Sequence, residues 1–269
     1  MVGDGFGPAS QTFARIATTR STTESQRYQH IIVKDGKHRQ NNEGDHLILD
    51  TLLSGTVRTY SHDSFVTDSA AGATAYTCAL KTYNGAIGVD PEGKPCATLM
   101  EAAMLRGMRT GIVVTTNITD ATPAAFSAHA THRSQQSKIA YQQIVDMARL
   151  NKKDKWGVDV MFGGGRCFFQ PSSAPSPGAV SCRDDDRDVY GMAQRQYGYH
   201  VAETRQQMNA LNSLPALGLF SNVEMKYNLD RSIEDEESET EPTLAEMTQK
   251  ALQLLKANTK KDQGFFLMV

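Results

Sequence analysis

Apolar residues alternate along the chain between helical spacing and short strand-like runs. A capping box at Thr98–Glu101 and a glycine at position 107 predict a helix over residues 98–107. A second capping box at Thr243–Glu246 opens apolar residues at helical spacing. Buried strands are predicted where apolar runs occur, at residues 111–116, 158–162 and 265–269. Further helices are predicted after Pro8 and from Ser69 to Lys81.

The alternation of strands and helices predicts an α/β fold, a three-layer sandwich with a largely parallel central sheet that is incomplete in this chain. Ligands of such sheets bind beyond the carboxyl ends of the strands. We therefore expect Asp4, after a strand ending at Val2, and Asp120, after the strand ending near Thr116, to lie at one rim.

Composition limits the classes of function and domain organisation. The 269 residues carry 28 basic and 30 acidic side chains, a net charge of −2, which argues against nucleic-acid binding. We expect a single domain over 1–269, with a polar surface insertion at 19–45 and a solvated acidic loop at 234–241. Apolar runs are too short for a membrane anchor.

A glycine-rich turn begins at Gly3, only two residues after the start of the chain, and the chain ends within the apolar run 265–269. A core strand needs partners for its backbone and its apolar faces, so we expect a partial domain. A genuine terminal strand at a sheet edge is the alternative.

Two acidic residues lie beside small residues at candidate ligand sites. Asp4 between glycines permits close approach to an ion, although Asp-Gly is also a common turn. Ser69 follows Asp68 at a helix start, where exposed N–H groups favour an anion; an N-cap alone is the alternative. A Gly-x-Ser-x-Gly elbow is absent, which gives no support to an acyl-transfer hydrolase.

Further candidates follow the strand at 111–116. Asp120 and Thr122 offer a carboxylate and a hydroxyl for a hard cation such as magnesium, or else form an ordinary turn. Arg133 has the planar fork that binds phosphate, although most arginines are surface charges. His129 and His132 could share a helix face and are interpreted as a packed or exposed pair rather than zinc ligands. We expect the glycosylation acceptor at Asn117 to be unused.

Four cysteines are present, and none is spaced as a Cys-x-x-Cys site. Cys167 and Cys182 flank a polar loop at 170–181, which a disulfide could close in an oxidising compartment. Cys78 is predicted to be a small buried residue.

Several segments, taken in order, resemble the alkaline phosphatase family, most closely its fungal vacuolar-type branch. The resemblance covers nearly the whole chain and is weakest at 19–45 and 171–179. It is carried by residues 66–75, 79–90, 119–125 with Arg133, 163–165, 217–220 and 242–248.

The resemblance implies a metal-dependent phosphomonoesterase with two zinc ions and one magnesium ion. Ser69 would be the nucleophile and a zinc ligand, Asp68 would orient Arg133, and Arg133 would bind the phosphate. Asp4, Asp120 and Thr122 would ligate metal, and an aspartate rather than a histidine at position 120 favours magnesium. The family further implies small phosphomonoester substrates, a homodimer in the complete protein, and a vacuolar or secretory location.

The family's remaining metal ligands follow the strand that corresponds to residues 265–269 and are missing from this chain. We therefore expect this chain to bind zinc poorly and to hydrolyse phosphate esters negligibly. The alternative is a non-catalytic anion-binding protein or pseudophosphatase. A metal-dependent mutase or sulfatase fits the surroundings of Ser69 less well.

Overall fold

The computed structural model describes residues 1–20, 47–173, 180–231 and 241–269. They fall into two compact units, one of Met1–Val2 with Thr59–Val269 and one of Gly3–Arg58. The expected insertion at 19–45 lies outside the described residues, apart from the first two, which end a helix. The single-domain organisation over 1–269 stays a prediction.

The unit Gly3–Arg58 contains α1 (Pro8–Arg20) and α2 (Ile48–Leu52). Pro8 suits the first helical position because its missing N–H would have no partner there. Arg15 Nε donates to Asp50 Oδ2 at 2.9 Å, which links the two helices across a long gap in sequence.

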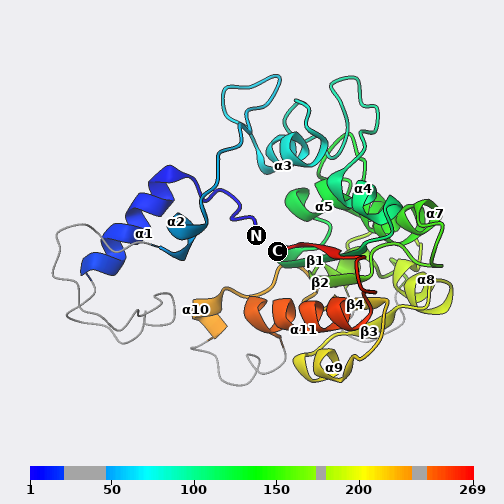
Figure 1. Cartoon of the computed structure of the whole chain (residues 1–269). Coiled ribbons are helices and arrows are strands. Elements are labelled where there is room, and N and C mark those ends of the chain that lie inside the picture. Colours follow the sequence, from blue (N-terminus) through cyan, green and yellow to red (C-terminus); the bar gives the residue numbers. More distant parts are fainter. Residues whose placement is uncertain (21–46, 174–179, 232–240) are drawn as a thin grey trace. The chain divides into compact units, whose positions relative to one another are not determined.

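The larger unit is built around a sheet of five parallel strands in the order β3-β4-β2-β1-β5 (Figure 1). β1 lies between β2 and β5, with Gly111 opposite Val160 of β2 on one side and Leu267 of β5 on the other. This confirms the predicted parallel sheet. The strands are β1 (Arg109–Asn117), β2 (Val160–Gly164), β3 (His200–Ala202), β4 (Ala216–Leu219) and β5 (Phe265–Met268).

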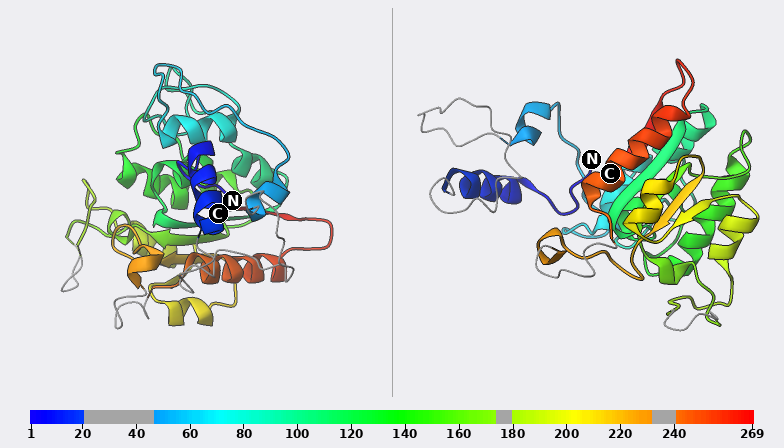
Figure 2. Two further views of the ribbon diagram at one scale, coloured as in Figure 1. Left: turned by 90° about the vertical axis from the view of Figure 1, so that its left-hand side faces the viewer. Right: turned by 90° about the horizontal axis from the view of Figure 1, so that it is seen from below.

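Helices cover both faces of this sheet, as the views in Figure 1 and Figure 2 show. Successive strand residues point to opposite faces, so Ile112 joins one core cluster and Val113 the other. The three-layer arrangement is therefore confirmed. The first face carries α4 (Leu99–Leu105), α5 (Ala121–Ser127), α6 (Gln136–Tyr141), the π-helix η3 (Gln142–Asp146), α7 (Met147–Leu150) and α8 (Val189–Arg195); the second carries α9 (Arg205–Ala210) and α11 (Leu244–Ala257).

Three further helical elements complete the described part of the unit: α3 (Ser69–Cys78), the 3-10 turn η4 (Arg166–Phe168) and α10 (Asn228–Arg231). Both predicted capping boxes form, with Thr98 accepting from the backbone N–H of Glu101 and Thr243 from that of Glu246. Within the described ranges, no helix is both long and apolar enough to cross a membrane.

Three local predictions are wrong. The helix from Ser69 ends at Cys78 rather than Lys81, because Ala79 takes a left-handed conformation (φ 56°). Val2 lies outside the strands; its N–H donates to the carbonyl of Val269 at 2.6 Å. The acidic run lies outside the described residues except Glu241, which is buried rather than solvated and whose carboxylate accepts the N–H of Lys226.

Two disulfides tie loops of the larger unit together. Cys167 is bonded to Cys182, the pairing suggested by the polar loop between them. Cys78 is bonded to Cys96, so the prediction of a small buried thiol is wrong. The reason is tertiary: the loop carrying Cys96 folds back against the carboxyl end of α3.

The disulfide Cys167–Cys182 should stabilise the fold measurably. The double variant Cys167→Ser/Cys182→Ser is expected to lose about 3 kcal/mol of unfolding free energy, since the bridge spans 15 residues and restricts the unfolded chain. Urea unfolding without reductant, compared with the wild type, measures this loss. Coincident unfolding curves would contradict it.

Candidate active site

The first turn of α3 is fixed by the Asp68 side chain. Asp68 is the N-cap residue, and its Oδ1 accepts the backbone N–H of Ala71 at 2.9 Å. Small residues from Ala70 to Ala75 are buried and allow α3 to pack closely against α5. Ser69 therefore begins the helix with its side chain half-exposed.

The second oxygen of Asp68 binds a turn that is distant in sequence. Asp68 Oδ2 accepts the N–H of Gly85 at 2.9 Å, and Asn84 Oδ1 accepts the N–H of Asp68 at 3.0 Å. Gly85 has φ +90°, and a Cβ there would lie 2.8 Å from the His132 ring, so a side chain would strain the backbone and displace that ring. The Asn-Gly pair at 84–85 is a strong turn signal in the sequence, but its contact with Asp68 depends on the tertiary structure.

Arg133 lies against the same turn. Its N–H donates to the carbonyl of Gly85 at 2.7 Å. Its guanidinium donates to Asp68 Oδ2 and Ser69 Oγ, both at 3.4 Å, and to Asp120 Oδ1 at 3.1 Å. Partial burial disfavours the cation, but the carboxylates of Asp120 and Asp68 outweigh this and raise the pKa of Arg133. A fixed cation thus lies beside the Ser69 hydroxyl.

Asp120 reaches Arg133 because α5 begins directly after β1. Asp120 is the N-cap residue of α5, but its side chain makes no capping hydrogen bond and binds the guanidinium instead. Thr122 lies in the first turn of the same helix and is buried. The structure therefore brings together Asp68, Ser69, Asp120 and Arg133. Thr122 lies close to Asp120, in the first turn of α5.

Asp4 belongs to the unit Gly3–Arg58, where it lies in a turn before Gly5 (φ +67°). Its participation in the site stays a prediction.

The two histidines have different partners in the structure. His129 binds Gly88 and Glu101, whereas His132 is exposed and binds Ser134 Oγ, and both lie in a loop rather than on one helix face. Asn117 of the formal glycosylation motif is buried, with its amide bonded to Gln136.

The donor set decides which metal the described residues fit. In the described part of the chain, no three His, Cys, Asp or Glu side chains form a group that could hold a metal. Catalytic zinc normally has three protein ligands, so these residues do not fit the implied zinc ions. The carboxylate of Asp120 and the hydroxyl of Thr122 are hard oxygen donors of the kind magnesium uses.

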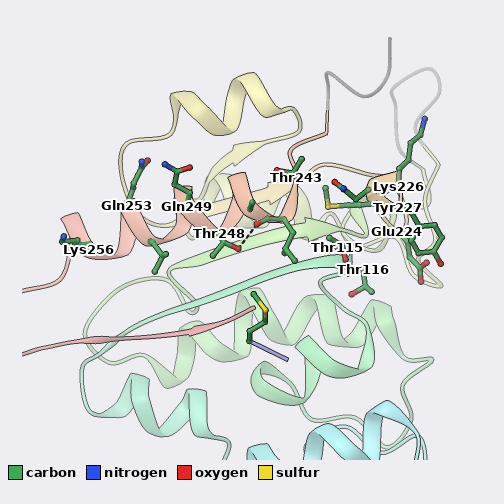
Figure 3. Close-up of a pocket in the computed structure, with 16 residues that line it drawn as sticks. Thr115, Thr116, Glu224, Lys226, Tyr227, Thr243, Thr248, Gln249, Gln253 and Lys256 are labelled. Carbon is green, nitrogen blue, oxygen red and sulfur yellow. Dashed lines mark hydrogen bonds between the residues drawn. The ribbon is translucent and has the colours of Figure 1, made fainter. Parts of the chain in front are cut away.

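A separate cleft of about 1160 Å³ lies between the carboxyl end of β1 and α11 (Figure 3). Thr115 and Thr116 line one side, and Thr248, Gln249 and other α11 side chains line the other. Ser69 and Arg133 are not among its lining residues.

Comparison with known proteins decides the family. The family model described as alkaline phosphatase matches residues 1–269.

The chain belongs to the alkaline phosphatase family.

Fungal alkaline phosphatases are among its relatives. The chain is 42% identical over 273 residues to the alkaline phosphatase of Schizosaccharomyces pombe and 40% identical over 281 residues to the repressible alkaline phosphatase of Saccharomyces cerevisiae. All of this chain is covered in both cases, but only 45% and 44% of the relatives. The chain therefore spans less than half the length of these relatives.

Solved alkaline phosphatases share the fold. A cold-active enzyme from a psychrophilic Shewanella species matches with a TM-score of 0.73 at 31% identity, covering 100% of this chain and 54% of that chain. A variant of the enzyme from the Antarctic bacterium TAB5, described with magnesium bound, matches with a TM-score of 0.60 at 29% identity, covering 79% of this chain and 52% of that chain.

The two-sided role of the Asp68 carboxylate can be tested by Asp68→Asn. An amide keeps one acceptor oxygen but turns its N–H₂ group either toward the Ala71 N–H or toward both the Gly85 N–H and the Arg133 cation, so we expect a loss of about 1–3 kcal/mol of unfolding free energy. Urea unfolding and amide exchange at Gly85 measure it.

The matched control is Asp188→Asn. Asp188 is the N-cap residue of α8 and pairs with the exposed Arg195. Since an exposed ion pair contributes little, this change should cost well under about 1 kcal/mol. Equal losses in the two variants would contradict the special role of Asp68.

Proposed function

We propose that the chain carries the nucleophile and phosphate-binding part of a metal-dependent phosphomonoesterase. This proposal rests on the Arg133 guanidinium, which Asp68 and Asp120 hold beside the Ser69 hydroxyl. An arginine fork matches two phosphate oxygens, and a hydroxyl at the same place can attack phosphorus. Asp68 acts as the orienting residue of this catalytic group.

The proposed reaction has two steps. Ser69 Oγ forms a bond to phosphorus as the bond from phosphorus to the leaving alcohol breaks, giving a phosphoserine and the free alcohol. Water then cleaves the phosphoserine and releases inorganic phosphate. Throughout, Arg133 binds the non-bridging oxygens, whose negative charge its fixed cation stabilises.

Metal binding is part of the proposal. As the family resemblance implies, Asp120 and Thr122 would hold magnesium, Asp4 would be a metal ligand, and Ser69 would face zinc. A bound divalent ion supplies charge stabilisation and activates oxygen nucleophiles. The described residues contain no three-ligand group for zinc.

The same shortage of zinc ligands among the described residues favours a second candidate for this chain by itself, which is anion binding without turnover. In that case Arg133 and Ser69 bind phosphate, and ester hydrolysis is negligible. By the family resemblance, a full-length family member would hydrolyse small phosphomonoesters and form a homodimer. The two disulfides support a vacuolar or secretory location, since such bonds persist in oxidising compartments.

Phosphate binding tests the shared core of both candidates. Arg133→Ala should weaken binding of inorganic phosphate by about tenfold or more, the loss of a charged hydrogen-bonding partner. Calorimetric titration of the purified chain measures this affinity. Arg149→Ala is the control, because Arg149 is exposed and pairs only with Asp146 among the contacts described. Equal phosphate affinity in the wild type and Arg133→Ala would refute the proposed site.

Turnover separates the two candidates. A chromogenic phosphate ester is assayed with zinc and magnesium added, using the wild type and Ser69→Ala. Negligible hydrolysis by both, with phosphate binding retained, is the result expected for anion binding by this chain. Zinc-dependent turnover that Ser69→Ala abolishes would show that the chain itself completes the catalytic site.

A further inference from the structure

Gly88 is a junction in the loop that follows the Asp68-binding turn. Its N–H donates to Thr74 Oγ1 of α3 at 3.0 Å, and its carbonyl accepts the N–H of Cys96 at 3.0 Å. The same carbonyl lies 2.6 Å from Nδ1 of His129. Gly88 has φ +56°, and a Cβ there would lie 2.5 Å from the Ala128 carbonyl, so the close approach of the two segments requires glycine.

The other ring nitrogen of His129 binds a different element. Nε2 lies 2.9 Å from Oε1 of Glu101, whose second oxygen accepts the N–H of Thr98 in the capping box of α4. The main chain of His129 is held in addition by Gln142 of η3, through bonds of 2.8 and 2.9 Å to its N–H and carbonyl. His129 thus joins the Gly88 loop, α4 and η3.

Both ring nitrogens of His129 face oxygen acceptors, so each must carry a proton for both contacts to be hydrogen bonds. Burial lowers the pKa of His129, but Glu101, the Gly88 carbonyl and the charge of Asp146 outweigh it and raise the pKa above its ordinary 6.5. Burial likewise disfavours the Glu101 carboxylate, and the bonds from His129 and Thr98 still lower its pKa. Among the described residues, Glu101 on α4 and Asp146 on η3 are the charged groups that act on this ring.

The contacts of His129 border those of the candidate active site. Ile87 and Ala130 form a backbone bridge with both bonds at 2.9 Å. Gly85, two residues before Ile87, binds Asp68 through its N–H and Arg133 through its carbonyl. The His129 ring therefore fastens the same two segments that align Arg133 with Asp68.

We propose that His129 is a positioning residue of the Arg133 site, which as a cation bridging Gly88 and Glu101 fixes the segment 128–133 against the segment 85–88. This inference rests on the proposed function, since Arg133 is the group it positions. When His129 loses a proton, one ring nitrogen faces an acceptor without a hydrogen, and the link weakens.

The direction of the pH effect follows from the raised pKa. The stabilisation by His129 is fully present below its unfolded value near 6.5 and is lost as pH rises through the higher folded value. Alkaline pH should therefore loosen the segment that carries Arg133.

Glu101→Gln gives the sharpest test. The amide oxygen of the substituted side chain can keep the bond from Thr98, while its N–H₂ group donates to His129 Nε2. A neutral His129 with its proton on Nδ1 then satisfies every contact, so the need for a cation disappears. Glu246→Gln is the matched control, because Glu246 has the same capping position in α11.

Three measurements are made across the titration range: the His129 ring nitrogen shifts, amide protection of Ala130 and Arg133, and affinity for sulfate, whose charge is constant over this range. In the wild type and in Glu246→Gln, His129 should be doubly protonated at neutral pH, and both protection and sulfate affinity should fall about tenfold as it titrates. In Glu101→Gln the ring should be neutral and this pH dependence absent.

His129→Gln should lower protection of Ala130 and Arg133 about tenfold at neutral pH, whereas His200→Gln, at an exposed strand position, should not. A neutral His129 in the wild type, or protection unchanged by His129→Gln, would overturn the positioning role. Sulfate that fails to bind the wild type would count against the proposed function, while ring titration and amide protection would still decide the role of His129. If His129→Gln does not fold, the comparison of wild type with Glu101→Gln decides it.

Discussion

The carboxylate of Asp68 is the constraint on which the rest of the candidate site depends. One oxygen caps α3, and the other binds both the Gly85 N–H and the Arg133 guanidinium. A carboxylate can accept several hydrogen bonds at once, which no other small side chain does as well. The start of the helix, the distant turn and the cation are thereby fixed relative to one another, and Ser69 at the helix start lies within 3.4 Å of the cation.

The sheet supplies the rigid frame for this arrangement. β1 is buried and paired on both sides, and α5 follows it without a long loop, so Asp120 has little freedom at the point where it meets Arg133. α3 packs on α5 through small buried residues such as Ala70 and Ala124. A site whose parts stand on packed elements keeps its geometry better than one on free loops.

The loop between the Asp68-binding turn and α4 is held at several points. The disulfide Cys78–Cys96 ties it to the far end of α3, and Thr74 ties it to the middle of that helix. His129 adds the link to α4 and η3. These contacts surround Gly88. Its backbone lies so close to Ala128 and His129 that there is no room for a side chain.

The sequence by itself determined the α/β architecture, because β-branched runs and capping boxes are local signals. Strands β1, β2 and β5 of the parallel sheet and one helix on each of its faces, α4 and α11, form where these signals predict them. It also selected Asp68, Ser69, Asp120 and Arg133, since residue type limits the chemistry that each can perform. Contacts between distant segments could not be predicted from the sequence. The partner of Cys78, the burial of Glu241 and the bridging role of His129 all depend on segments far apart in the chain. Only the tertiary structure decided these contacts, because the free energy of a hydrogen bond or disulfide depends on which groups the packed core brings within reach.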